Sequence, residues 1–174
     1  PVETAPMIKM AAVIEEAAPM APAAPRWKAE IERALANEGL QLHFQPIINV
    51  HGEIRELFEA VLYLENAQGE LVPAREFMPA AEEHGLAGKI DRWVAMRSAE
   101  ALTSLINGGK SATLLAPMSS ATIADNLLLA AIQQHLKTAS IPAEHFRLQV
   151  EAAALARDPG ASMAFAQIVK RAGM

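Results

Sequence analysis

The chain contains no cysteine, no cluster of Lys and Arg, and no long apolar run. Without cysteine it can form neither a disulfide framework nor a thiolate metal site, which fits a reducing compartment. The formal net charge of -5 argues against binding to nucleic-acid polymers or anionic membranes. No apolar run approaches the roughly 18 residues of a membrane span, and the start lacks a signal-peptide layout. We therefore expect a cytoplasmic segment without direct membrane contact, while tethering by regions outside it stays open.

The chain has 174 residues, of which 52% are hydrophobic, so it can bury a substantial core. Its length favours one domain plus a tail. Residues 1–25 contain five Pro and eight Ala, a composition that prevents a continuous helix and offers little to pack. We interpret them as a linker or tail. Because the first residue is Pro rather than Met, we expect the chain to be a segment of a longer protein or a processed product.

Residues 41–64 alternate in a way that predicts two strands joined by a tight turn at residues 51–52. One face of the second strand is uninterrupted and apolar. The other face carries Glu59 together with Val61 and Tyr63. A carboxylate among such neighbours is costly to bury unless it is hydrogen-bonded, ligates a metal or becomes protonated. Glu59 is therefore the first candidate for a functional residue.

Strand and helix patterns alternate after this hairpin, and the helices are long enough for right-handed crossovers. The class is therefore α/β with an at least partly parallel sheet of four strands. Ser119 or Ser120 is expected to cap the fourth helix, whose apolar residues include Leu127 and Leu128, and Asp158 to cap the last helix. The expected helices span residues 27–37, 76–84, 90–106, 120–139 and 159–173; the later strands span residues 113–118 and 145–151, and residues 71–73 form an extended segment.

Five landmarks follow one another without large gaps: FQPI at 44–47, EAV at 59–61, LVPAREFMPAAEEHGL at 71–86, IDRWV at 90–94 and IP at 141–142. In this series the chain resembles the N-terminal part of an EAL domain, the fold of cyclic di-GMP phosphodiesterases and receptors. EAV stands where the family has its Glu-Ala-Leu motif. The resemblance implies a partial TIM-type (β/α) barrel with an antiparallel first strand. It divides the chain into an Ala/Pro-rich linker or tail at 1–25 and an EAL-like domain at 26–174.

The family's reaction, as the resemblance implies it, is hydrolysis of one phosphodiester bond of cyclic di-GMP by two metal ions held by carboxylates and an Asn. Glu59 matches the motif carboxylate, but Pro117 stands at the ligand Asn. Gln149 and Ala152 stand at the two carboxylates of the family pattern Glu-Ile-Thr-Glu, and Tyr63 replaces a phosphate-binding Arg. The chain also ends before the family's Asp-Asp-Phe-Gly segment. We expect no Mg²⁺ or Mn²⁺ site, no cofactor and no catalytic residue here.

The resemblance makes Gln45, Glu59, Val61, Tyr63 and Pro73 the candidate contacts for cyclic di-GMP. Each has an ordinary structural alternative. Glu59 could be hydrogen-bonded by Gln45, by His43 or by a water, and the Gln45 amide could equally be its structural partner. Val61 and Pro73 could serve packing or a turn, and Tyr63 could be a core aromatic rather than a base-stacking one.

The favoured hypothesis is a catalytically inactive module that binds cyclic di-GMP and regulates a protein partner. A scaffold that has lost nucleotide binding is the first alternative, and a working phosphodiesterase is the least favoured. A closed barrel takes about 250 residues, so the chain supplies only the first half of one. The open strand edge and apolar faces of a half-barrel favour association with a partner or with a second copy.

Overall fold

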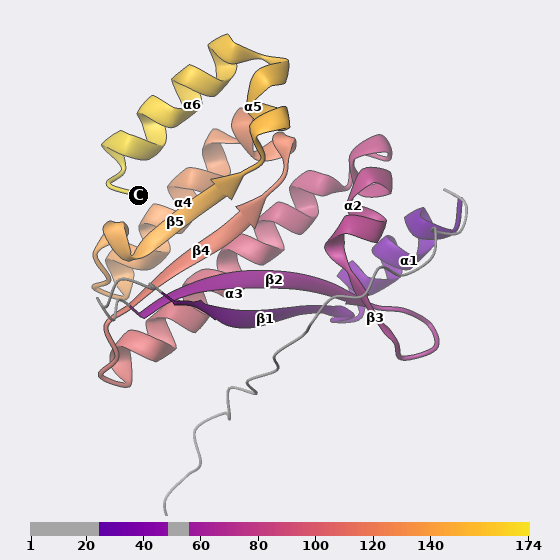
Figure 1. The fold of residues 1–174 in the computed structure, drawn as a ribbon, viewed down its shortest axis with the longest axis horizontal. Helices are drawn as coiled ribbons and strands as arrows, with labels where there is room; N and C mark the ends of the chain where they lie inside the picture. The colour runs from indigo at the N-terminus through magenta and orange to yellow at the C-terminus, as the bar shows by residue number, and fades with distance from the viewer. Residues whose placement is uncertain (1–24, 49–55) are drawn as a thin grey trace, which may run out of the picture.

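The computed structural model describes residues 25–48 and 56–174 (Figure 1). The expected tail at 1–25 lies almost wholly outside these residues, and so does the predicted turn at residues 51–52. The elements in chain order are α1 (Pro25–Ala36), β1 (Leu40–Ile47), β2 (Glu56–Glu65), β3 (Leu71–Pro73), α2 (Ala74–Glu83), α3 (Ala87–Asn107), β4 (Ala112–Met118), the 3₁₀-helix η1 (Ser120–Ala124), α4 (Asn126–Thr138), the 3₁₀-helix η2 (Ala143–His145), β5 (Phe146–Val150), α5 (Ala152–Arg157) and α6 (Pro159–Arg171).

The strands form one five-stranded sheet in the order β1-β2-β4-β5, with the short β3 on the side of β2. β1 and β3 are antiparallel to β2, whereas β2, β4 and β5 are parallel to one another. This arrangement confirms the predicted α/β class and the TIM-type half-barrel, in which the first strand runs against β2, β4 and β5. The extended segment at residues 71–73 is itself a strand. The sheet formed by the described residues is not closed.

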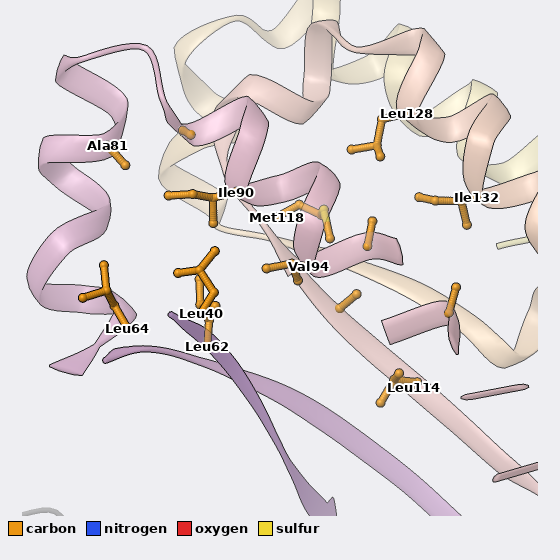
Figure 2. Packing of buried hydrophobic residues seen from close by; sticks show 14 of the residues in the cluster. Leu40, Leu62, Leu64, Ala81, Ile90, Val94, Leu114, Met118, Leu128 and Ile132 are labelled. Atoms are coloured by element: carbon orange, nitrogen blue, oxygen red, sulfur yellow. The ribbon is translucent and has the colours of Figure 1, made fainter. Parts of the chain in front are cut away.

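Helices cover one face of this sheet, and α3 runs behind β2 and β4 (Figure 1). The strand residues on that face alternate with partly exposed neighbours, as period-two packing requires. Figure 2 shows Leu62 of β2 beneath Ile90 of α3 and Leu64 beneath Ala81 of α2, in the same cluster as Leu128 of α4. Burial of this continuous apolar cluster is the main force that holds the helices to the sheet.

The opposite face of the sheet carries the other set of alternating side chains. In β4, Thr113, Leu115 and Pro117 are half-buried, whereas their neighbours toward the helices are fully or almost fully buried. Glu59 lies on this open face in β2, and Gln149 is exposed on it in β5. In a closed barrel the same face would line the interior.

The start of α4 differs from the prediction. Ser119 does cap a helix, but its hydroxyl accepts the Ala121 N–H at the start of the 3₁₀-helix η1. α4 begins only at Asn126, where the Asp125 side chain accepts the Leu128 N–H. The intervening turn changes the phase of the helix, so Leu127 is 75% exposed while Leu128 is fully buried.

Residues 152–157 also differ, since they form α5, for which no helix was predicted. At the next boundary Asp158 caps α6 through the Ala161 N–H and is followed by Pro159, as predicted. The end of α2 was predicted correctly as well. Gly85 adopts a φ of 67°, a left-handed conformation that suits glycine and stops the helix.

Candidate functional site

A cleft of about 730 Å³ lies at the carboxyl ends of β4 and β5, bounded by α2, α3 and α5. Five of the predicted site residues line it: Gln45, Glu59, Val61, Pro117 and Gln149. In barrels built from parallel strands, the carboxyl ends carry the ligand and the chemistry. The cleft is therefore the candidate functional site. Tyr63, Pro73 and Ala152 are not among its lining residues.

Gln45 and Glu59 meet because the antiparallel register pairs their Cα atoms directly across β1 and β2. The Gln45 amide Nε2 donates to Glu59 Oε2 at 3.0 Å. The side chain of Glu59 is half-buried and that of Gln45 is exposed. One of the structural alternatives for Glu59, a hydrogen bond from Gln45, is thus present. One oxygen of the Glu59 carboxylate accepts this hydrogen bond, and both residues still line the cleft.

The predicted degenerate metal positions lie next to one another. Pro117 and Gln149 are Cα partners in the parallel β4–β5 ladder, and both line the cleft. Ala152 is the first residue of α5 and is exposed. A pyrrolidine ring and a methyl group supply no ligand atom, and an amide supplies only a neutral oxygen. Within residues 25–48 and 56–174, no three His, Asp or Glu side chains are grouped to hold a metal ion.

These residues do not fit a two-metal centre. Such a centre needs several hard, charged oxygen ligands around two ions that lie a few ångströms apart. Of the positions for which the resemblance implies metal ligands, only Glu59 carries a carboxylate, and Gln45 already hydrogen-bonds to it.

Tyr63 and Pro73 lie beside the cleft rather than in it. They are Cα partners across β2 and β3. The Tyr63 ring contacts the ring of His43, with centroids 4.8 Å apart and planes inclined by 43°. Tyr63 follows Val61 by two residues and so lies on the same face of β2. A longer, charged side chain at this position would start close to the cleft.

Sequence analysis did not identify Asp91, a buried carboxylate on α3 that lines the cleft. Its Oδ1 accepts the Ser119 N–H at 3.0 Å, and its Oδ2 accepts the hydroxyls of Ser119 at 2.7 Å and Thr122 at 2.5 Å. Burial raises the pKa of the Asp91 carboxyl above its usual value, although the hydrogen bonds from Thr122 and Ser119 lower it. Asp91 thereby anchors the segment after β4 that forms one wall of the cleft. The signal was available, since helical spacing puts Asp91 on the same face as Ala87 and Val94.

Three further polar residues form the rim of the cleft, from α2, η1 and α5. The Ser120 hydroxyl donates to Glu82 Oε1 at 3.2 Å. The Arg157 Nη1 lies 3.5 Å from Glu82 Oε2 and 3.5 Å from Ser120 Oγ. Arg75 of α2 also lines the cleft. Arg157 was missed because it belongs to α5, which the sequence pattern did not reveal.

The sheet is half of a barrel with an antiparallel first strand, and the cleft lies at its carboxyl edge. These features place the chain among TIM-type (β/α) barrel domains. Residues 28–174 match the EAL domain family, and the chain belongs to that family. It is similar to the EAL domain of FimX from Xanthomonas citri in complex with c-diGMP, with 30% identity and a TM-score of 0.76 over 86% of this chain and 58% of that one. The FimX EAL domain from Pseudomonas aeruginosa bound to c-di-GMP is 34% identical, with a TM-score of 0.71 over 84% of this chain and 57% of that one.

Among curated proteins, the chain is similar to the cyclic di-GMP phosphodiesterase PdeR of Escherichia coli strain K12. The two are 30% identical over 107 residues, which cover 62% of this chain and 16% of PdeR. The chain thus spans a small part of this curated relative. In the described part of the chain, no helix combines the length and apolar character needed to cross a membrane.

Proposed function

We propose that this chain is a catalytically inactive EAL module of bacterial cyclic di-GMP signalling. It binds cyclic di-GMP in the cleft without metal ions and, in the cytoplasm, changes how a protein partner docks. The proposal rests mainly on the difference between two pairs of residues that line the cleft. The Gln45–Glu59 pair is retained on the hairpin, whereas Pro117 and Gln149 occupy the facing positions where metal ligands would be needed.

Ligand binding is supported by the size and lining of the cleft. Its volume of about 730 Å³ falls within the range of roughly 300–1,000 Å³ that small-molecule sites occupy. Val61 offers an apolar contact, while Gln45 and Glu59 offer a donor and acceptors that suit a guanine edge. Two similar FimX domains are described as bound to this dinucleotide.

The lack of catalysis is supported by the chemistry of the same positions. In-line attack on a phosphodiester assisted by two metal ions requires ligands that hold both ions and lower the pKa of the attacking water. The side chains of Pro117, Gln149 and Ala152 bring no negative charge to this task. A working phosphodiesterase is therefore the least favoured reading.

A scaffold that has lost nucleotide binding is the second candidate. Tyr63 stands where the family has a phosphate-binding Arg, and its ring packs on His43 instead of carrying a charge. The cleft lining also has more carboxylates than guanidinium groups, which disfavours an anion.

Association with a protein partner or with a second copy is supported by the sheet itself. Among the described residues, β1 and β5 are the outermost strands of the order β1-β2-β4-β5. Ile47, the last residue of β1, is 39% exposed. Unpaired strand edges and exposed apolar side chains promote association.

A thermal unfolding series tests the proposal. A ligand that binds only the folded chain stabilises it by RT ln(1 + [L]/Kd), about 2.7 kcal/mol at a hundredfold excess over Kd. We expect the Tm to rise with cyclic di-GMP equally in magnesium and in EDTA. GMP at the same concentration serves as the control. A Tm that does not change with cyclic di-GMP would favour the scaffold. A rise in Tm that requires magnesium would contradict metal-free binding.

A further inference from the structure

The cleft holds few positive charges to meet an anionic ligand. Among the described residues that line it, the cationic side chains are Arg75 and Arg157, against the carboxylates of Glu59, Glu82, Asp91 and Glu151. Cyclic di-GMP carries a negative charge on each of its phosphodiester groups. Since Tyr63 brings no charge, a guanidinium that contacts the phosphate in this cleft would have to come from Arg75 or Arg157.

Arg157 has the geometry for this contact. Its Nη1 lies 3.5 Å from both Glu82 Oε2 and Ser120 Oγ, clearly longer than the 2.7–2.9 Å of a tight charge-assisted hydrogen bond. Its side chain is 64% exposed, and that of Glu82 is 34% exposed. An ion pair this long and this exposed contributes little to stability, so another anion can displace the carboxylate easily.

The rim offers the Glu82 carboxylate another partner when Arg157 leaves. The Ser120 hydroxyl donates to its other oxygen, Oε1, at 3.2 Å. Glu82 can therefore keep one hydrogen bond while the guanidinium turns to the ligand. Planar guanidinium groups bind phosphate oxygens through two parallel N–H donors, which a lysine ammonium cannot reproduce.

We propose that Arg157 is the phosphate-binding residue of this cleft and that Glu82 is the counter-ion it exchanges for a phosphodiester of the ligand. The inference rests on the proposed function, because it names the contact through which the cleft would recognise cyclic di-GMP. In this proposal, the positive charge that Tyr63 does not supply comes from Arg157 of a different element, α5.

Titration of fluorescently labelled cyclic di-GMP with the complete 174-residue chain tests the inference. We expect Arg157→Ala to weaken binding by about tenfold or more, the usual effect of losing a charge-assisted hydrogen bond. Arg157→Lys should recover only part of that loss. Glu82→Gln should tighten binding by roughly two- to fivefold, because it removes the competing carboxylate but keeps an acceptor for Ser120.

Arg97→Ala is the matched control. Arg97 is also a half-exposed arginine in a loose pair, 3.2 Å from Glu100, but it lies outside the cleft lining. Circular dichroism melting of each variant verifies that it is folded. If the unmodified chain binds and Arg157→Ala binds equally well, the inference is overturned while the proposed function stands. If the unmodified chain does not bind at all, both are overturned. Equal losses in Arg97→Ala and Arg157→Ala would also overturn the inference, since they would reflect net charge alone.

Discussion

Gln45 and Glu59 face each other across the β1–β2 ladder, and the Gln45 amide donates to the Glu59 carboxylate at 3.0 Å. The family resemblance makes both residues candidate contacts for cyclic di-GMP, and both line the cleft. Substitutions distinguish the structural role of this hydrogen bond from the proposed role in ligand binding.

Glu59→Ala is expected to weaken cyclic di-GMP binding by about 1 kcal/mol or more, because a ligand donor loses its acceptor. The free energy of unfolding should change by less than about 1 kcal/mol, since the hydrogen bond to Gln45 is exposed. Calorimetry and denaturant titration measure the two effects. Glu56→Ala, at an exposed position on the same strand, serves as the control. Unchanged affinity with a large loss of stability would assign Glu59 a purely structural role.

Tyr63→Arg is expected to strengthen binding by about 1.5–3 kcal/mol, the range of hydrogen bonds to charged groups. The new side chain would begin two residues beyond Val61, on the face of β2 that leads to the cleft. Tyr63→Phe keeps the ring contact with His43 and should leave affinity unchanged. No gain in Tyr63→Arg would indicate that its guanidinium does not reach the phosphate.

Asp91→Ala is expected to lower the free energy of unfolding by about 1–3 kcal/mol, because the buried hydroxyl of Thr122 and the Ser119 N–H lose their acceptor. Urea denaturation measures the loss. Asp125→Ala removes a helix cap nearby and should cost about 1 kcal/mol. A smaller effect for Asp91→Ala than for Asp125→Ala would contradict the anchoring role of Asp91.

The same carboxyl predicts a pH dependence. Burial raises the pKa of Asp91 above 3.8 in the folded chain, so between that value and the folded pKa the folded state binds more protons than the unfolded state. Stability contributed by this group is therefore lost as pH rises through the folded pKa. We expect the unmodified chain to lose stability relative to Asp91→Asn as pH increases from 4. A difference between the two that stays constant with pH would contradict this.

Leu127 and Leu128 test the phase of α4. Leu128→Ala should cost about 2–5 kcal/mol, because Leu128 is fully buried in the core. Leu127→Ala should change the free energy of unfolding by less than about 0.5 kcal/mol, because Leu127 is 75% exposed. Similar losses for both would contradict the helix start at Asn126.

The sequence was sufficient to predict four of the five strands of the described sheet, but not that residues 71–73 pair with β2 as β3. Alternation along the hairpin placed Glu59 and Val61 on one face of their strand, and the family resemblance pointed to Pro117 and Gln149, which the structure pairs across β4 and β5. The strand predictions succeeded because period-two patterns and turn residues act locally.

What the sequence did not reveal depends on contacts between distant residues. Asp91 finds Ser119 and Thr122 only after α3 packs beside β4, and Arg157 meets Glu82 across the cleft. α5 is a single short run of AAALAR, and the residue before it, Glu151, makes no side-chain cap. Leu127 is exposed because α4 starts later than predicted, with Asp125 rather than Ser119 or Ser120 as its cap. Propensity alone does not choose between adjacent capping residues.

We propose that the cleft binds cyclic di-GMP without metal ions and without hydrolysing it. Calorimetric titration of cyclic di-GMP into the folded 174-residue chain, once with magnesium and once with EDTA, tests it most directly. Chromatography of the nucleotide recovered from the calorimeter cell then reports whether cyclic di-GMP was cleaved. We predict one saturable isotherm with the same affinity in both buffers and intact cyclic di-GMP at the end. Linear dinucleotide formed only with magnesium, or no binding heat in either buffer, would contradict the account.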